Sequence, residues 1–313
     1  MLTFVLRRLV SGVAALFVTS SVTFFLLYFS SSSVARNILG ESATSSQVHQ
    51  KEIELGLDQP LISRYLSWLR GLLHGDLGTS WFTSGSVAGN IASRLSATLS
   101  IVAVAVIVTA VVSTLVGVTA AVRRGWTDRV LQVLSIGGAA VPQFLVGIVL
   151  VTVFAIRFGL FPATGYVPLA AGVRAWSSTM TLPVVALAIG GIASMSQQVR
   201  SAAIAALAKD YVRTLRSRGL SPREVIFRHV LRDAAPAALT VLSLQFIGLL
   251  GGVVVIEQIF ALPGIGYLAL QSATQGDMPM LMGVVVYTVL VVVAVNLLVD
   301  LAVAWLNPRV RIS

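Results

Sequence analysis

Six long apolar stretches dominate the pattern of hydrophobic and polar positions along this chain. A bilayer core of about 30 Å is crossed by roughly 20 apolar residues in an α-helix, and each stretch reaches that length. Most charged residues lie in the segments between them. The pattern therefore predicts an all-α integral membrane protein with six transmembrane helices, at about residues 9–29, 97–122, 130–156, 180–199, 236–256 and 281–306.

The first stretch follows Arg7 and Arg8 and contains no charge. It is longer than the apolar core of a signal peptide, which has about 7–15 residues, so an uncleaved anchor is favoured. Pro183 interrupts the fourth stretch, and glycines occur in the fourth and fifth. We interpret these glycines as sites of close helix packing, with a hinge role as the alternative: Gly190, Gly191, Gly248 and Gly252.

Composition excludes a soluble fold. The 313 residues are 56% hydrophobic and 11% charged, with a mean hydropathy of +0.90, whereas an ordinary globular protein is about a quarter charged. The absence of cysteine excludes disulfides, thiol catalysis and thiolate metal sites. The three histidines are far apart and form no zinc-binding pair, so neither a metal site nor a catalytic residue nor a cofactor is predicted.

The formal charge of +10 acquires a meaning once it is mapped onto the predicted spans. With the N-terminus inside, the inner segments hold 15 of the 22 Lys and Arg residues and a net charge of +11, whereas the outer segments net zero. This asymmetry is the positive-inside pattern of membrane proteins, and it displaces nucleic acid as a partner. We predict cytoplasmic termini and four parts: the N-terminus with the first span (1–29), an extracytoplasmic segment (30–96), a five-helix core (97–306) and a cytoplasmic tail (307–313).

The segment from 30 to 96 is predicted to be extracytoplasmic. It begins with Ser30–Ser33, which is typical of a flexible exit from the first span. Apolar residues then recur at helical spacing between Leu61 and Leu73, and Asp58 can cap the start of this helix. Trp68 suits the membrane interface. The helix lies along the membrane surface in this interpretation, and packing on the bundle is the alternative.

The inner loop from 200 to 235 carries the strongest local signals. Its first half is rich in helix formers, and Gly219 follows where a left-handed residue ends a helix. Ser221, Pro222 and Glu224 then form a capping box with proline in the first turn. The loop is therefore predicted to be a helix, a sharp turn and a second helix. It either covers the base of the bundle or docks into a soluble partner.

At this point the chain resembles a family. Asp210-Tyr211-Val212-Arg213-Thr214, Arg218-Gly219-Leu220-Ser221 and His229-Val230-Leu231-Arg232 are similar to the EAA loop of bacterial ABC-transporter permeases. The chain as a whole resembles the first permease subunit of the oligopeptide, dipeptide and nickel importers. Leu215 departs from the alanine usual there. Further matching segments, in order, are 56–61, 75–78, 94–99, Pro142 with Phe144, 161–163, Glu257 to Gly266, 296–300 and 307–311.

The resemblance implies an importer in the bacterial plasma membrane, with a second homologous permease subunit, two ATPase subunits and an extracytoplasmic substrate-binding protein. The inner loop would sit in a cleft of an ATPase subunit. This chain lacks the P-loop pattern G-x-x-x-x-G-K-[ST], so it is expected to be a non-catalytic subunit whose partner hydrolyses ATP. The residues expected to couple it to the ATPase are Asp210, Tyr211, Arg213, Thr214, Arg216, Arg218, Gly219, Ser221 and Glu224.

Two acidic residues lie close to predicted span ends, Glu257 in the fifth span and Asp300 in the sixth. Ionisable residues at depth are candidates for the substrate pathway, although structural pairing is favoured for both. An ion-driven secondary transporter or channel is the alternative function, and an intramembrane hydrolase lacks a nucleophile elbow. Peptides are the default cargo for the resemblance; nickel, glutathione, opines and some sugars remain open.

Overall fold

The computed structural model describes residues 2–30, 34–123 and 125–306. Within these ranges the regular elements are helices, joined by loops and by one isolated bridge between Thr79 and Ser86. The predicted cytoplasmic tail at 307–313 and most of the serine run, at 31–33, fall outside the described residues. The chain divides into two compact units, which are discontinuous in sequence. Helices α5 (Val87–Val122) and α13 (Met278–Leu306) each contribute to both.

The N-terminal unit comprises Leu2–Thr98 and Pro263–Val293. Its buried clusters join the start of α5 to α12 and α13, and α1 to α13. One cluster contains Val87, Ile265 and Met280, and the other contains Phe24 and Met282. Its helices are α1 (Leu2–Ser30), α2 (Val34–Leu39), α3 (Ser45–Glu54), α4 (Leu61–Leu73), the start of α5, α12 (Ile265–Gln275) and most of α13.

The core unit comprises Leu99–Leu262 and the segment from Ala294 onward. Helix α8 lies at its centre and packs against α6, α7 and α11. The unit contains most of α5, the end of α13, α6 (Trp126–Ala140), α7 (Gln143–Leu150), a π-helical segment (Val151–Arg157), a 3-10 turn (Leu169–Ala171), α8 (Val173–Leu207), α9 (Asp210–Ser217), α10 (Pro222–Glu224), a second π-helical segment (Val225–Val230) and α11 (Leu231–Ile259).

Among the described residues, five helical stretches are long and apolar enough to cross a membrane, and a bent pair of helices makes a sixth if it is one crossing. The bent pair replaces the predicted third span. Helices α6 and α7 meet at 95° across Val141 and Pro142, so the prediction of a span over 130–156 missed a break within it. Proline disfavours helical geometry in the preceding residue, and Val141 is accordingly extended (φ −83°, ψ 121°).

The predicted interruption of the fourth span is also wrong. Helix α8 runs for 35 residues and contains Pro183 without ending there. Proline is tolerated inside membrane helices because surrounding groups compensate for the lost hydrogen bond. Here the helix is largely buried by its neighbours around Pro183, where Leu187 and Ala188 are fully buried. Helix α5 likewise begins at Val87, earlier than the predicted start at residue 97.

The predicted helix between Leu61 and Leu73 has the bounds of α4, but Asp58 does not cap it. Pro60 occupies the N-cap position without a side-chain hydrogen bond, because the residue with fixed φ directly precedes the first helical turn. One face of α4 packs on α1: the rings of Tyr65 and Phe24 have centroids 5.2 Å apart. Ile62 and Leu73 on other faces are 67% and 78% exposed, so the helix both packs on the bundle and keeps an apolar surface. Helices α2, α3 and α12 were not predicted.

Candidate functional site: the loop between α8 and α11

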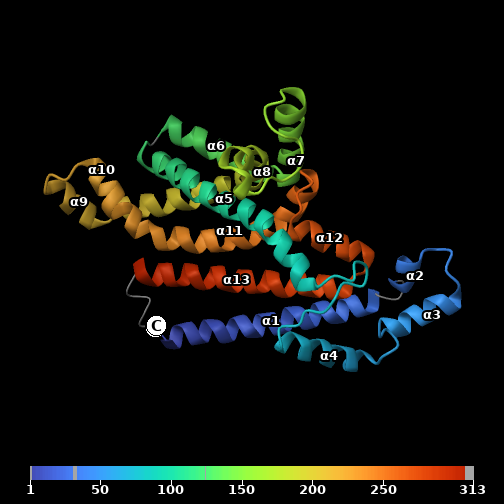
Figure 1. Ribbon diagram of the computed structural model, residues 1–313. Helices are drawn as coiled ribbons and strands as arrows, with labels where there is room; N and C mark the ends of the chain where they lie inside the picture. The colour runs from blue at the N-terminus through green and yellow to red at the C-terminus, as the bar shows by residue number, and fades with distance from the viewer. Residues whose placement is uncertain (1, 31–33, 124, 307–313) are drawn as a thin grey trace. The chain divides into compact units, whose positions relative to one another are not determined.

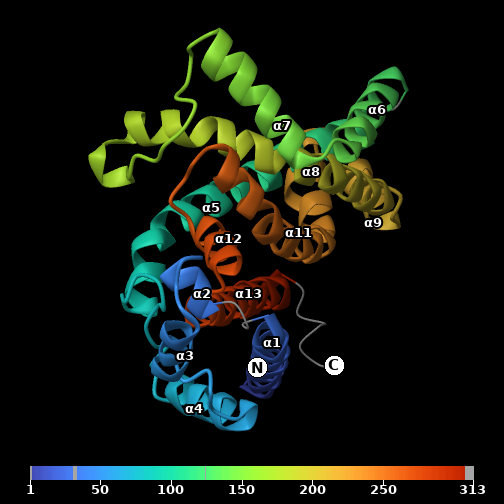
Figure 2. The ribbon, with the colours of Figure 1, turned by 90° about the vertical axis from the view of Figure 1, so that its right-hand side faces the viewer.

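The predicted helix–turn–helix lies at the ends of α8 and α11, where Figure 1 labels α9 and α10. Its first helix is divided, because α8 ends at Leu207 and α9 starts at Asp210. Lys209 is extended between them (φ −72°, ψ 148°). The second helix continues through a π-helical segment into α11, and Pro236 lies inside that helix. Figure 2 shows α9 beside α8 and α11 from a second direction.

A small apolar cluster holds α9 on the rest of the core unit. Val212 of α9 is 1% exposed and packs with Ala203 and Ala206 of α8. Val225 and Val230, which follow the turn, belong to the same cluster. Leu215, the departure from the family pattern, packs at its edge. Burial of this face fixes which side of α9 is turned outward.

A polar contact adds to this anchorage. Lys209 Nζ donates to Asp233 Oδ2 at 2.7 Å, and the Tyr211 hydroxyl donates to the same oxygen at 3.3 Å. Burial raises the pKa of Tyr211, and the negative charge of Asp233 and this hydrogen bond raise it further. The contact joins the start of α9 to the start of α11, although the three residues are exposed or half-buried.

The predicted turn geometry is confirmed. Gly219 has φ +83°, the left-handed conformation that ends a helix. Its N–H donates to the carbonyl of Arg216 at 3.0 Å, and Leu220 N–H donates to Leu215 O at 3.3 Å. Ser221 then caps the next helix by accepting from the Glu224 N–H at 3.3 Å. The chain therefore reverses direction at one glycine between two helices with defined ends.

The outward face of this loop is strongly basic. Its arginines are exposed, so the outward side of the loop is cationic, whereas the side packed on the core unit is apolar. Two acids of the loop, Asp210 and Glu224, are also exposed, and Glu224 lies 3.6 Å from Arg228 in an exposed pair. Of the predicted coupling residues, those exposed are Asp210, Arg213, Thr214, Arg216, Arg218, Gly219, Ser221 and Glu224, whereas Tyr211 is half-buried.

One ion pair near this loop was not predicted. Arg200, in the last third of α8, makes two 2.6 Å hydrogen bonds to Asp128 at the start of α6. The side chains are 25% and 13% exposed. Both residues were placed in cytoplasmic segments by the charge pattern, so their contact agrees with that topology. Only the separation of 72 residues hid the pairing from a sequence search.

Polar side chains between the helices of the core unit were also missed. Gln143, the first residue of α7, donates to the carbonyl of Leu187 in α8 at 3.5 Å. Gln245 of α11 donates to Ser194 of α8. Both glutamines lie in apolar stretches, where an uncharged polar residue gives little signal in hydropathy.

The packing role of the glycines is confirmed at two of the four predicted positions. A side chain at Gly252 would overlap the Gln143 amide, and one at Gly191 would lie 3.1 Å from Thr109. Gly190 has only ordinary contact distances, and Gly248 has nothing within 4 Å of the position of a Cβ atom. The glycine spacing in the sequence could not distinguish these positions, because it does not show which faces meet.

The two acidic pathway candidates have different surroundings. Glu257, in the last turn of α11, is fully buried. Asp300 of α13 is half-buried. The structure does not bring either residue into the loop between α8 and α11, and the predicted pathway roles stay predictions.

Comparison with known proteins places the whole chain. Residues 113–312 match the family described as "Binding-protein-dependent transport system inner membrane component", and residues 1–102 match the corresponding N-terminal family. A Brucella abortus protein provisionally named a peptide transport system permease is 36% identical over 308 residues, covering 98% of each chain. The glutathione transport system permease protein GsiC of Escherichia coli K12 is 31% identical and covers 99% of each.

A solved structure supports the same fold. The chain resembles a subunit of the MetNI methionine ABC transporter in an inward-facing conformation, with a TM-score of 0.57 and 17% identity. The match covers 69% of this chain and 96% of the other. The resemblance stated from sequence motifs is thereby confirmed. The chain belongs to the binding-protein-dependent transport system inner membrane components and is a multi-pass permease subunit of an ABC importer.

Proposed function

We propose that this chain forms half of a translocation pathway for peptides or similar small solutes, delivered by an extracytoplasmic binding protein. The cargo class follows the names of the similar proteins, which include peptide and glutathione transport permeases. We further propose one homologous permease partner and two ATPase subunits. In this assembly ATP binding closes the ATPases and favours an outward-facing pathway, as in other two-state transporters.

The loop between α8 and α11 carries the coupling proposal. Its apolar face is buried on α8, its turn is fixed by Gly219, and its arginines face outward. Helix α9 follows α8 and leads through the turn to α11, so a displacement of its outer face would move both long helices. We therefore assign ATPase contact to the exposed residues of α9 and the following turn, with Arg213 and Arg216 at the contact.

The proposed topology places this loop and both termini in the cytoplasm. Its support is the +11 net charge of the inner segments together with contacts between segments assigned to one side. Asp128 contacts Arg200 on the proposed inner side, and Gly165 N–H donates to Phe260 O on the proposed outer side at 3.0 Å. The ion-driven alternative lacks such support, because the family is that of ABC permeases.

Glu257 and Asp300 are retained as proposed pathway residues. Glu257 is fully buried in this conformation, so contact with a solute requires α11 to separate from its neighbours. While Glu257 is buried in this way, its proposed role is structural. Asp300 is half-buried and needs a smaller rearrangement.

The absence of cysteine makes a direct test possible. Ser217→Cys in α9 and Ser63→Cys in α4 each introduce one thiol at an exposed position. In the assembled importer we expect Ser217→Cys to cross-link to an ATPase subunit. In intact cells, a membrane-impermeant maleimide should label Ser63→Cys only. Labelling of Ser217→Cys from outside would contradict the cytoplasmic position of the loop. A cross-link to the ATPase from Ser63→Cys but not from Ser217→Cys would contradict the coupling role of α9.

A further inference from the structure

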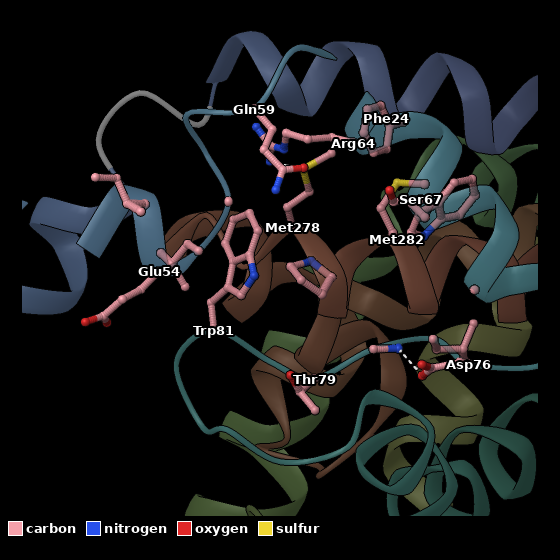
Figure 3. A pocket seen from close by; sticks show the side chains of 18 residues that line it. Phe24, Glu54, Gln59, Arg64, Ser67, Asp76, Thr79, Trp81, Met278 and Met282 are labelled. Atoms are coloured by element: carbon pink, nitrogen blue, oxygen red, sulfur yellow. Dashed lines mark hydrogen bonds between the residues drawn. The ribbon is translucent and has the colours of Figure 1, made fainter. Parts of the chain in front are cut away.

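A cavity of about 490 Å³ lies within the N-terminal unit and is not used by the coupling loop or by the proposed pathway residues. Its walls come from the turn after α3, from α4, from the loop before α5 and from the first turns of α13 (Figure 3). Small-molecule sites occupy about 300–1,000 Å³. The cavity is therefore large enough for a small organic ligand.

Arg64 gives this cavity a positive charge without an acidic partner. Its guanidinium carbon lies 5.2 Å from the centre of the Tyr28 ring, and Nη2 lies 3.6 Å from the sulfur of Met278. Burial lowers the pKa of Arg64, but a guanidinium stays protonated in proteins. Among the residues that the structure describes, Arg64 forms no ion pair with a carboxylate. Among the described residues, the groups in contact with this half-buried charge are thus a ring and a thioether.

The acids on the cavity wall are engaged elsewhere. Asp76 Oδ1 accepts the Gly78 N–H at 2.8 Å, and Glu54 pairs with Lys51 at 3.0 Å. Removing a charge from water costs free energy unless an opposite charge or hydrogen bonds replace the water. The carboxylates of the described cavity wall are thus bonded to groups other than Arg64, so an anion can approach its guanidinium, and the amide of Gln59 on the same wall can add a donor.

The rest of the wall is apolar and aromatic. Phe24, Trp68, Trp81, Met278 and Met282 line the cavity, and Figure 3 shows Trp81 and both methionines turned toward its interior. Flat rings and flexible thioethers accommodate apolar groups of varied shape. The site places one cation beside aromatic and thioether groups, while Glu54 and Asp76 on the same wall are bonded to other partners, and this combination suits an amphipathic anion at Arg64.

We propose that this cavity binds a small amphipathic anion, with its carboxylate or phosphate on Arg64 and its apolar group against Trp68 and Trp81. The anion is either a soluble carboxylate or the headgroup of an anionic phospholipid, since α4 also carries an exposed apolar surface. Binding does not depend on the proposed cargo or on ATPase coupling. Only the placement of the site on the outer side rests on the proposed topology.

Tryptophan fluorescence tests the proposal, because two of the five tryptophans line the cavity. The full chain is placed in phosphatidylcholine nanodiscs with Trp126, Trp176 and Trp305 replaced by phenylalanine. The soluble probe is 4-phenylbutyrate, and 4-phenylbutylamine has the same apolar group with the opposite charge. We expect saturable quenching by the acid and none by the amine. A second arm adds brominated phosphatidylglycerol, with brominated phosphatidylcholine as its control.

Arg64→Gln should weaken anion binding by about tenfold or more, because a charge-assisted hydrogen bond is lost. Arg70→Gln is the matched control, since Arg70 is exposed on the same helix and does not line the cavity. Arg64-dependent quenching by the acid identifies a soluble ligand, and the same result with phosphatidylglycerol alone identifies a lipid headgroup. Equal quenching by acid and amine, or the absence of quenching in both arms, would overturn the proposal even if Arg64→Gln fails to fold.

Discussion

Arg200 and Asp128 are joined by two hydrogen bonds of 2.6 Å, which tie α8 to α6 in the core unit. A planar guanidinium matches a carboxylate in this bidentate geometry, and both side chains are mostly removed from solvent. The pair lies on α8 ahead of α9, so it fixes the helix that carries the coupling loop. Substitution of either residue therefore tests the contact.

Asp128→Asn should lower stability by roughly 1.5–3 kcal/mol, the range for hydrogen bonds to charged groups. Arg200→Lys should lower the stability, but by less than Arg200→Ala, because lysine keeps the positive charge and loses the bidentate geometry of the guanidinium. Thermal unfolding is measured for the purified chain, for each single variant and for the double variant, which completes a double-mutant cycle. Additive effects of Asp128→Asn and Arg200→Lys would show that the two residues are not coupled.

The contact between Gly252 and Gln143 predicts a position-specific effect of alanine. A Cβ atom at Gly252 overlaps the Gln143 amide, so Gly252→Ala should displace this side chain and cost about 0.5–1.5 kcal/mol through loss of its hydrogen bond to Leu187. Gly248→Ala is the control on the same helix, because nothing lies within 4 Å of its Cβ position. The melting temperature should fall for the first variant and stay or rise for the second. The reverse order would contradict this arrangement of α7 and α11.

Replacement of Gly219 tests the coupling turn. Its φ of +83° costs an L-residue about 1–2 kcal/mol, and asparagine tolerates this region better than alanine does. We expect Gly219→Ala and Gly219→Asp to insert into the membrane but to lower uptake relative to ATP hydrolysis in the assembled importer. Gly219→Asn should retain more coupling. Normal transport by all three variants would show that coupling does not depend on the turn at Gly219.

Tyr211 predicts a dependence on alkaline pH. Burial, followed by the charge and hydrogen bond of Asp233, raises its pKa above the ordinary value near 10. Since the folded state binds this proton more tightly, the stabilisation is complete below the unfolded pKa and is lost as pH rises through the folded pKa. Absorbance of tyrosinate should therefore show a late-titrating group.

Tyr211→Phe should remove one late-titrating group while retaining the ring in the apolar cluster, and Tyr267→Phe in α12 serves as the control. The lost hydrogen bond should cost about 0.5–1.5 kcal/mol at neutral pH. Asp233→Asn should move the Tyr211 titration to lower pH because the negative charge is removed. An unchanged titration in Asp233→Asn would refute the contact between α9 and α11.

Local conformation was predictable where a few neighbouring residues decide it. Gly219 and Ser221 have the predicted turn and cap, because both depend on φ and on one hydrogen bond within the segment. The bounds of α4 were likewise predictable from its apolar spacing, whereas Asp58 was wrongly expected to cap it. In that case a proline two residues later determined where the helix began.

By itself, the sequence determined that this is a membrane protein, which segments are long enough to span the bilayer, which permease family it resembles and where a turn separates two helices. Apolar length, motif order and backbone preference are properties of the chain that need no partner. The tertiary structure alone decided that the helix bends at Pro142 and continues through Pro183, that Arg200 meets Asp128, and that Arg64 faces a cavity with aromatic walls. Those outcomes depend on which helix faces meet, and residues far apart in the chain supply the opposing side of each contact.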